Sequence, residues 1–261
     1  MSDQPVVLLT GASRGIGAHA ATWLARSGAE LALVARDADA LARVSANARL
    51  IGANVLELPA DVIATGVAKR VVSAVLDRFG RLDALVNNAG IAGPVGHVAT
   101  VDLQDWRRTI ETNLLAAVAF IQAAAPELRR QKGTIVNVTS EVADIASESI
   151  EPYAGSKAAL RHLTRTLAEE EPSLTVVSYD PGPCDTDLMA EIRSQAHATM
   201  GPALAAAYHD LHDSGALIKP QDTARVLAWL ATSAPAKLSG RVINHADKDA
   251  QLSAHRALPA P

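Results

Sequence analysis

The sequence predicts an α/β fold built on a doubly wound parallel sheet of about seven strands, with helices on both faces. Short aliphatic or β-branched runs alternate with longer Ala-rich amphipathic stretches along the chain, which is the pattern of parallel strands joined by crossover helices. Several runs are continuously apolar, as in strands that are covered on both faces. The 261 residues suffice for one core and contain no linker or repeat, so we expect a single domain.

Each expected strand is a short aliphatic run, and each expected helix is the longer stretch that follows it. The runs VVLLT, LALVA, NVLELP, DALVN, GTIVNVT, LTVVSY and GRVIN give strands at 6–10, 31–35, 54–59, 83–87, 133–139, 174–179 and 240–244. The helices lie at about 15–27, 38–51, 65–79, 103–131, 152–170 and 221–232. The segment 187–220 is helical in composition but falls outside this alternation, which predicts a helical substrate loop.

Composition excludes several classes of function. The net charge is −4 with no basic stripe, so neither nucleic acid nor an anionic membrane is an expected partner. No window reaches the roughly 18 apolar residues of a membrane span, and the apolar run at 6–9 is too short for a signal peptide. The one cysteine, Cys184, excludes an internal disulfide and fits a reducing compartment. We expect a soluble cytoplasmic protein. His209 and His212 could share a helix face, but no second pair of ligands accompanies them, so no metal site is expected.

The segment TGASRGIG, residues 10–17, joins the first strand to the first helix. Its glycines allow a tight turn and a close approach of the backbone to a pyrophosphate. The start of the following helix adds free N–H groups and the positive end of its dipole. A glycine-rich turn that binds nothing is the alternative, but this turn lies where such a fold binds a dinucleotide. The expected contacts are Gly11, Ser13, Arg14, Gly15, Ile16 and Gly17.

The end of the second strand indicates which nicotinamide cofactor binds. An acidic residue about twenty positions after the glycines would bind the adenosine ribose hydroxyls and favour NAD, whereas a basic residue accommodates the 2′-phosphate of NADP. Ala35 takes the acidic position, Arg36 follows it, and Arg14 adds a second positive charge. The sequence therefore favours NADP(H). Asp37 would reverse this preference if the register differed by one or two residues.

Several short motifs follow one another in a fixed order along the chain. They are TGxxxGxG at 10–17, Asp61-Val62, NNAG at 87–90, Asn113, Ser140, Tyr153-x-x-x-Lys157 and PGPCDT at 181–186. Each is weak alone, but in this order they resemble the short-chain dehydrogenases/reductases over nearly the whole chain. The resemblance implies a single Rossmann-type NAD(P)-binding domain over residues 1–261, and an oxidoreductase that acts on a small-molecule carbonyl compound.

The spacing of Tyr153 and Lys157 places both on one face of the predicted helix. In the family that the chain resembles, hydride passes from the nicotinamide to a carbonyl carbon while the tyrosine gives its proton to the oxygen. The resemblance implies that Tyr153 is the general acid/base and that Lys157 lowers its pKa and holds the nicotinamide ribose. It also implies that Ser140 orients the carbonyl and that Asn113 holds a water in a proton relay. A helix-kink or capping role is the alternative for Asn113.

The resemblance implies further contacts with the cofactor. Asp61 and Val62 would meet the adenine, and Thr186 would contact the nicotinamide amide. The remaining contacts are Asn88, Ala89, Gly90, Pro181 and Gly182. Cys184 stands where the family usually has an aliphatic residue, and we interpret it as a small buried filler.

The second half of the chain is similar to the sepiapterin reductase and benzil reductase branch of the family. The similarity lies in EEP at 170–172, PGPCDTD at 181–187 and SGRVIN at 239–244, and it implies reduction of an activated ketone such as an α-diketone. Pterin reductases anchor the substrate amino group with a carboxylate where this chain has Asn244, which argues against a pterin. Asn244 stays a candidate substrate contact beside Ser140 and Tyr153. Glu141 and Asp144 could also line the pocket, or be solvated loop acids.

Other functions remain open. A non-catalytic dinucleotide sensor could use the same fold, although the joint presence of Asn113, Ser140, Tyr153 and Lys157 argues against it. An NAD-dependent alcohol dehydrogenase is a third possibility. The two long helices at 103–131 and 152–170 carry broad apolar stripes, and the family usually associates through them. We therefore expect a homodimer or homotetramer.

Overall fold

The apolar runs of the sequence pair as parallel strands in the computed structural model, which describes residues 4–259. The strands are β1 (Val6–Thr10), β2 (Glu30–Ala35), β3 (Val55–Pro59), β4 (Ala84–Asn87), β5 (Thr134–Val138), β6 (Thr175–Asp180) and β7 (Val242–Asn244). They form one sheet in the order β3-β2-β1-β4-β5-β6-β7, and every neighbouring pair is parallel. This confirms the doubly wound sheet, with strand ends within about two residues of those expected.

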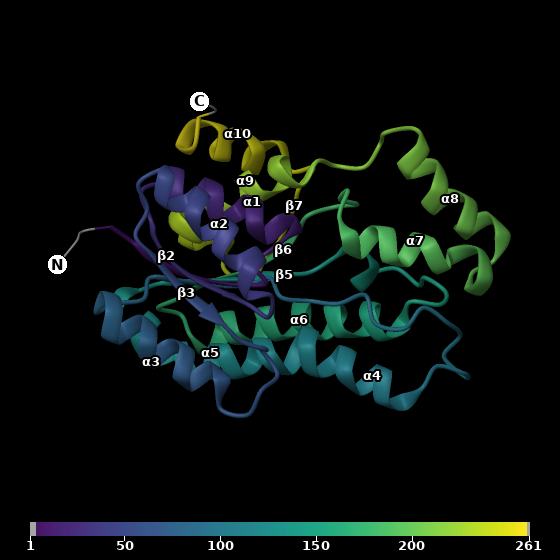
Figure 1. Ribbon diagram of the computed structural model, residues 1–261, viewed down its shortest axis with the longest axis horizontal. Helices are drawn as coiled ribbons and strands as arrows, with labels where there is room; N and C mark the ends of the chain where they lie inside the picture. The colour runs from purple at the N-terminus through teal and green to yellow at the C-terminus, as the bar shows by residue number, and fades with distance from the viewer. Residues whose placement is uncertain (1–3, 260–261) are drawn as a thin grey trace.

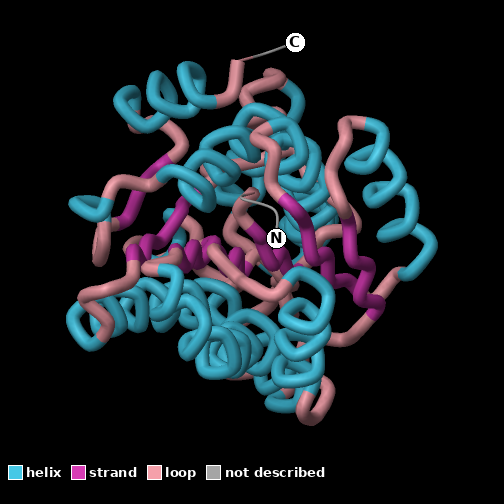
Figure 2. Tube along the Cα trace, turned by 90° about the vertical axis from the view of Figure 1, so that its left-hand side faces the viewer, coloured by secondary structure: helices cyan, strands magenta, loops and turns pink. Residues whose placement is uncertain are grey.

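Helices cover both faces of the sheet (Figures 1 and 2). The upper face in Figure 1 carries α1 (Gly15–Arg26), α2 (Ala38–Leu50), α9 (Pro220–Ser233) and α10 (Lys248–Ala257). The lower face carries α3 (Val67–Phe79), α4 (Leu103–Ile110), α5 (Ala116–Gln131) and α6 (Glu151–Glu170). Val7 and Leu9 of β1 pack into the core under the first set, whereas Val6 and Leu8 pack into the other core. Burial on both faces explains why the strands are continuously apolar.

Two helical features differ from the expectation. The helix predicted over 103–131 is continuous but contains a π-helical turn, Glu111–Leu115, between α4 and α5. A π turn leaves a nearly normal apolar pattern on either side, so the sequence gives little sign of it. The C-terminal helix α10 was not among the expected elements; it packs against α9 through Ala250 and Ala254.

The segment outside the strand–helix alternation is helical, as predicted. It contains α7 (Asp187–Thr199) and α8 (Pro202–Asp213), which project beyond the end of the sheet (Figure 1). A small hydrophobic cluster, separate from the two sheet cores, packs these helices onto the domain. Its buried members are Ala92, Val95, Ile150, Ile192, Ala196, Met200 and Ala205. We call α7, α8 and this cluster the lid.

The topology places the predicted site at one edge of the sheet. Because all strands are parallel, the segments that follow β1, β2, β4, β5 and β6 meet at their carboxyl ends. The strand order reverses between β1 and β4, and such a switch point is where open α/β sheets bind ligands. Within residues 4–259, no helix is long and apolar enough to cross a membrane.

Candidate active site

A cavity of about 370 Å³ opens at the carboxyl edge of the strands, between the sheet and the lid. Most of the residues predicted for the site line it. They are Gly11, Ser13, Arg14, Gly15, Ile16, Gly17, Arg36, Asp61, Val62, Asn88, Ala89, Gly90, Ser140, Glu141, Tyr153, Lys157, Pro181, Gly182 and Thr186. The structure therefore brings together motifs that are spread over some two thirds of the chain.

The glycine turn is tight enough to exclude side chains at two positions. Gly11 has a φ of +67°, and a Cβ there would lie 2.8 Å from the Cα of Ala89. A Cβ on Gly17 would lie 2.1 Å from the carbonyl oxygen of Gly11. Helix α1 begins at Gly15, and Arg14 at its N-cap makes no side-chain capping bond. The uncapped N–H groups of the first helical turn fit a pyrophosphate.

The NNAG motif holds this turn against the sheet. The amide nitrogen Nδ2 of Asn88 donates to the carbonyl oxygens of Thr10 and Gly11, at 3.0 Å each. The Thr10 hydroxyl donates to the Val86 carbonyl at 3.2 Å and accepts the backbone N–H of Asn88 at 3.1 Å. These bonds fix the wall of the cavity between β1 and β4, before any ligand binds.

The end of the cavity beside β2 carries the positive charges that the sequence predicted. Arg36 lines the cavity and is exposed. Asp37, which could have reversed the cofactor preference, is not among the lining residues; its carboxylate caps α2 by accepting the Ala40 N–H at 2.9 Å. Arg14 pairs with Asp187 at 3.1 Å across the mouth of the cavity, and both side chains are mostly exposed.

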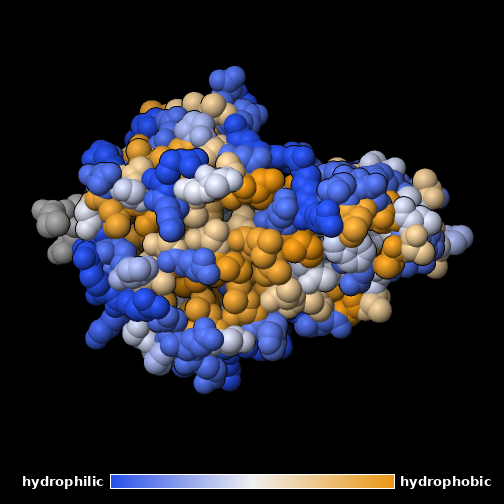
Figure 3. Space-filling view, turned by 90° about the horizontal axis from the view of Figure 1, so that it is seen from below, coloured by the Kyte–Doolittle hydropathy of each residue, from blue (hydrophilic) through white to orange (hydrophobic). Residues whose placement is uncertain are grey.

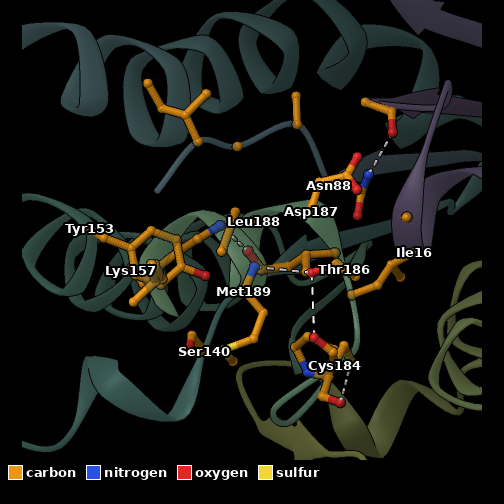
Figure 4. A pocket seen from close by; sticks show the side chains of 18 of the residues that line it. Ile16, Asn88, Ser140, Tyr153, Lys157, Cys184, Thr186, Asp187, Leu188 and Met189 are labelled. Carbon is orange, nitrogen blue, oxygen red and sulfur yellow. Dashed lines mark hydrogen bonds between the residues drawn. The ribbon is translucent and has the colours of Figure 1, made fainter. Parts of the chain in front are cut away.

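Tyr153 and Lys157 lie side by side on α6, and Ser140 follows β5 next to them (Figure 4). Helix α6 begins at Glu151, with Pro152 in its first turn, where proline is well tolerated. The Lys157 ammonium lies 5.6 Å from the centroid of the Tyr153 ring and donates to the Val138 carbonyl at 2.8 Å. All three side chains face the cavity from the β5–α6 side.

Burial controls the protonation of both groups. It raises the pKa of the Tyr153 phenol; the Ser140 side chain opposes this rise, and the negative charge of Asp180 adds to it. Burial also lowers the pKa of Lys157 to about 8. Burial is the largest influence on the phenol pKa in this structure. A phenol that keeps its proton at neutral pH is suited to donate it.

Asn113 lies in the π-helical turn, behind Gly90, and is buried. Its Oδ1 accepts the Ile91 N–H at 2.9 Å, and its Nδ2 lies 3.0 Å from both the Ile91 carbonyl and the Ser156 hydroxyl. It does not line the main cavity but a small neighbouring one. These contacts tie the loop after β4 to α6.

The other half of the cavity is apolar, and sequence reasoning had located it only as the segment 187–220. Its walls come from the loop before α6 and from the lid. They include Val142, Ile145, Ile150, Leu188, Met189, Ile192, Leu204, Tyr208 and Leu211. Burial raises the pKa of the Tyr208 phenol, which hydrogen-bonds Ser147. This half is suited to a largely apolar substrate.

Two predicted substrate residues lie elsewhere. Asn244 ends the edge strand β7, and its Oδ1 accepts the Ala246 N–H at 2.8 Å, so its amide closes a local turn and does not line the cavity. Asp144 is also outside the lining and pairs with Arg161. Glu141 does line the cavity. Burial raises the pKa of the Cys184 thiol to about 12, so it packs as an unreactive filler, as expected.

Comparison with known proteins gives a consistent family. The family model described as short chain dehydrogenase matches residues 5–197. An uncharacterised oxidoreductase of Schizosaccharomyces pombe is 32% identical over 244 residues, which cover 92% of this chain and 96% of that protein. A crystal structure of a short-chain dehydrogenase/reductase from Saccharomyces cerevisiae aligns with a TM-score of 0.89 and 29% identity, over 94% of this chain and 98% of that one. A crystal structure of the KRED1-Pglu enzyme aligns with a TM-score of 0.87 and 32% identity, over 92% of this chain and 100% of that one.

Solved neighbours hold nicotinamide dinucleotides. An actinorhodin polyketide ketoreductase variant, 28% identical to this chain, was solved with NADPH. A 7α-hydroxysteroid dehydrogenase, 26% identical, was solved with NADH and a 7-oxo bile acid. The family model and these relatives each match most of the chain. The chain belongs to the short-chain dehydrogenase family of oxidoreductases.

Proposed function

We propose that this protein is an NADPH-dependent carbonyl reductase, in which Tyr153 gives a proton to the oxygen of an activated ketone. One observation carries the proposal. The buried, protonated phenol of Tyr153 faces the cavity where its dinucleotide-binding half meets its apolar half. A phenol that holds its proton can donate it to a carbonyl oxygen.

The residues present fit the cofactor. The uncapped start of α1 would hold the pyrophosphate, and Arg36 with Arg14 would bind the 2′-phosphate. The capping role of Asp37 supports NADP over NAD, because it keeps that carboxylate away from the ribose position. Lys157 would hold the nicotinamide ribose, and Thr186 would contact the nicotinamide amide. When bound, NADPH supplies the hydride that reduces the carbonyl carbon.

The chain's own groups supply the proton and the surroundings. Ser140 holds the carbonyl oxygen beside the Tyr153 hydroxyl, and the phenolic proton passes to that oxygen. The Lys157 ammonium, 5.6 Å from the ring centroid, stabilises the phenolate that results. Apolar walls from the lid exclude water, which strengthens these electrostatic interactions.

The apolar half of the cavity supports α-diketones and related activated ketones as substrates, as does the similarity to the benzil reductase branch. The position of Asn244 outside the cavity gives no support to a pterin. The test is a panel of activated ketones with NADPH and NADH, followed by nicotinamide absorbance. Oxidation of NADPH by at least one diketone is expected. Tight NADPH binding without oxidation by any ketone would instead support a sensor, and faster alcohol oxidation with NAD would support a dehydrogenase.

We also propose a cytoplasmic homodimer or homotetramer that associates through α4–α5 and α6. Figure 3 shows apolar side chains gathered at the centre of the lower face. Leu103 at the start of α4 is 60% exposed, and Leu115 before α5 is 52% exposed. Exposed leucines on a helix face favour association. Light scattering should give a mass of at least twice the 27.2 kDa of the chain; a monomer at micromolar concentration would contradict this.

A further inference from the structure

A largely buried ionic cluster lies behind the cavity, and its charged members do not line the cavity. At its centre is Arg161, one turn after Lys157 on α6, whose side chain is only 5% exposed. Its Nη2 donates to Oδ2 of Asp180 at 2.8 Å, and the Asp180 side chain is 3% exposed. Its Nη1 donates to the carboxylate of Asp144, and its Nε donates to the Thr139 hydroxyl at 3.3 Å.

Each partner of Arg161 belongs to a segment that carries a site residue. Thr139 directly precedes Ser140 in the sequence. Asp144 ends the short 3-10 turn that follows Ser140. Asp180 ends β6, and its Oδ1 accepts the N–H of Gly182 at 3.0 Å, in the turn that leads to Thr186. One guanidinium therefore joins the proton donor's helix to two loops of the cavity.

A contribution to stability does not by itself explain why these charges are buried together. Taking a guanidinium and a carboxylate out of water is costly, and a well-packed apolar pair at the same place is often as stable. What the guanidinium offers is geometry, since its planar group has donors in several fixed directions and meets three acceptors from two loops at once. A lysine ammonium carries the same charge without that planar arrangement.

We propose that Arg161 is a positioning residue, which holds Ser140 and the Thr186 turn in register with Tyr153. The inference rests on the proposed function, because the relative positions of Ser140, Thr186 and Tyr153 matter for carbonyl reduction. Arg161 also balances the charge of Asp180. The groups that act on the Tyr153 phenol are Ser140, Lys157, Cys184, Tyr208 and Asp180, and Asp180 is the carboxylate among them.

The first test compares turnover with stability. Asp144 is exposed, so Asp144→Ala should fold normally while it releases the loop after Ser140. Its kcat for a diketone should fall about tenfold, with an unchanged KM for NADPH and an unchanged thermal midpoint. The kcat of Arg161→Met should fall further than that of Asp144→Ala, and Arg161→Lys should restore only part of the lost kcat. The matched control is Glu171→Gln, which breaks the pair with Arg129 at the other end of α6 and should leave kcat unchanged.

The second test uses the direction of a pH shift. In oxidation of the alcohol product with NADP⁺, kcat/KM should rise with pH as Tyr153 loses its proton. Arg161→Met leaves Asp180 uncompensated and should move this rise to higher pH, whereas Asp180→Asn should move it to lower pH, each by about 0.5 pH unit or more. If Arg161 served folding alone, the rise in kcat/KM would shift in the same direction along the pH scale in both variants, or would shift in neither.

A third measurement needs no substrate. Hydrogen exchange of the Asp144→Ala protein should be at least about fivefold faster in residues 139–147, and unchanged in α1. If the parent reduces no ketone, the proposed function fails while this measurement still decides whether Arg161 orders the loop. The inference is overturned if exchange is unchanged, or if an active parent and its Asp144→Ala and Arg161→Met variants turn over within twofold of one another.

Discussion

The buried ammonium of Lys157 should destabilise the free enzyme, so Lys157→Met should make it more stable while it removes the activity. The side chain is 4% exposed, and burial lowers its pKa from 10.5 to about 8. At about 1.4 kcal/mol per pKa unit, this drop corresponds to a cost of about 3 kcal/mol for holding the charge in the fold at pH 7. The variant also loses the hydrogen bond to the Val138 carbonyl, worth about 1 kcal/mol. A net stabilisation of ~2 kcal/mol is expected.

The sign of the pH dependence follows from the two pKa values. The unfolded chain keeps the lysine proton up to about pH 10.5, whereas the folded chain releases it near pH 8. Between these values the unfolded state binds more protons, so the stability of the parent rises with pH. The methionine variant lacks this gain. Its advantage should therefore be complete below pH 8, shrink above it and be lost by about pH 10.

The assay is urea unfolding without cofactor, followed by tryptophan fluorescence, at pH 7 and at pH 10. Other titrating groups are common to both proteins and cancel in the difference. Lys69→Met, on the exposed face of α3, is the matched control and should show no such pH-dependent difference. A Lys157→Met protein that is less stable than the parent at pH 7, or a difference that does not vary with pH, would refute the reasoning.

Three further outcomes are expected. Tyr153→Phe keeps the ring but removes its proton, so kcat should fall by at least ~10²-fold with little change in NADPH affinity; steady-state turnover of one diketone checks this, and a value within threefold of the parent contradicts it. Arg36→Asp should weaken NADPH binding by ~1.5–3 kcal/mol, measured by fluorescence titration; a parent with equal kcat/KM for NADPH and NADH would remove the basis for this. In Gly17→Ala, the new Cβ would lie 2.1 Å from the Gly11 carbonyl, so the turn must shift; both the thermal midpoint and NADPH affinity should fall, and a normal dissociation constant would show that the turn tolerates a side chain.

The sheet and most of the cofactor-binding site could be predicted because their signals are local. A strand buried on both faces reads as a continuous apolar run, as Val6 to Leu9 of β1 show, and this holds whatever its neighbours are. The glycine turn is a single short segment whose steric demand can be read from its spacing. The Tyr153–Lys157 pair belongs to one helix, so its geometry follows from the helical repeat alone.

What could not be predicted depends on contacts between distant segments. The sequence does not predict the ion pair between Arg161 and Asp180, because the two residues lie on different elements and each resembles an ordinary surface charge. Asp180 directly follows the strand expected at 174–179, and its position there does not point to a partner on another element. Asn244 seemed a substrate contact from its place in the chain, but the edge strand β7 keeps it in a local turn. The burial that raises the pKa of the Tyr153 phenol likewise depends on contacts between segments, which only the fold shows.

The separate packing of the lid has a consequence for how relatives of this enzyme diverge. The hydrophobic cluster around Ile192, Ala196 and Met200 shares no buried residue with either sheet core. Substitutions that reshape this cluster should have little effect on the stability of the two sheet cores. Sequence changes in the lid are therefore tolerated more readily than changes in the strands. New substrate specificities can therefore arise through substitution of a few lid side chains, while the half of the cavity around the glycine turn stays unchanged. Directed evolution for new ketones should begin with the lid.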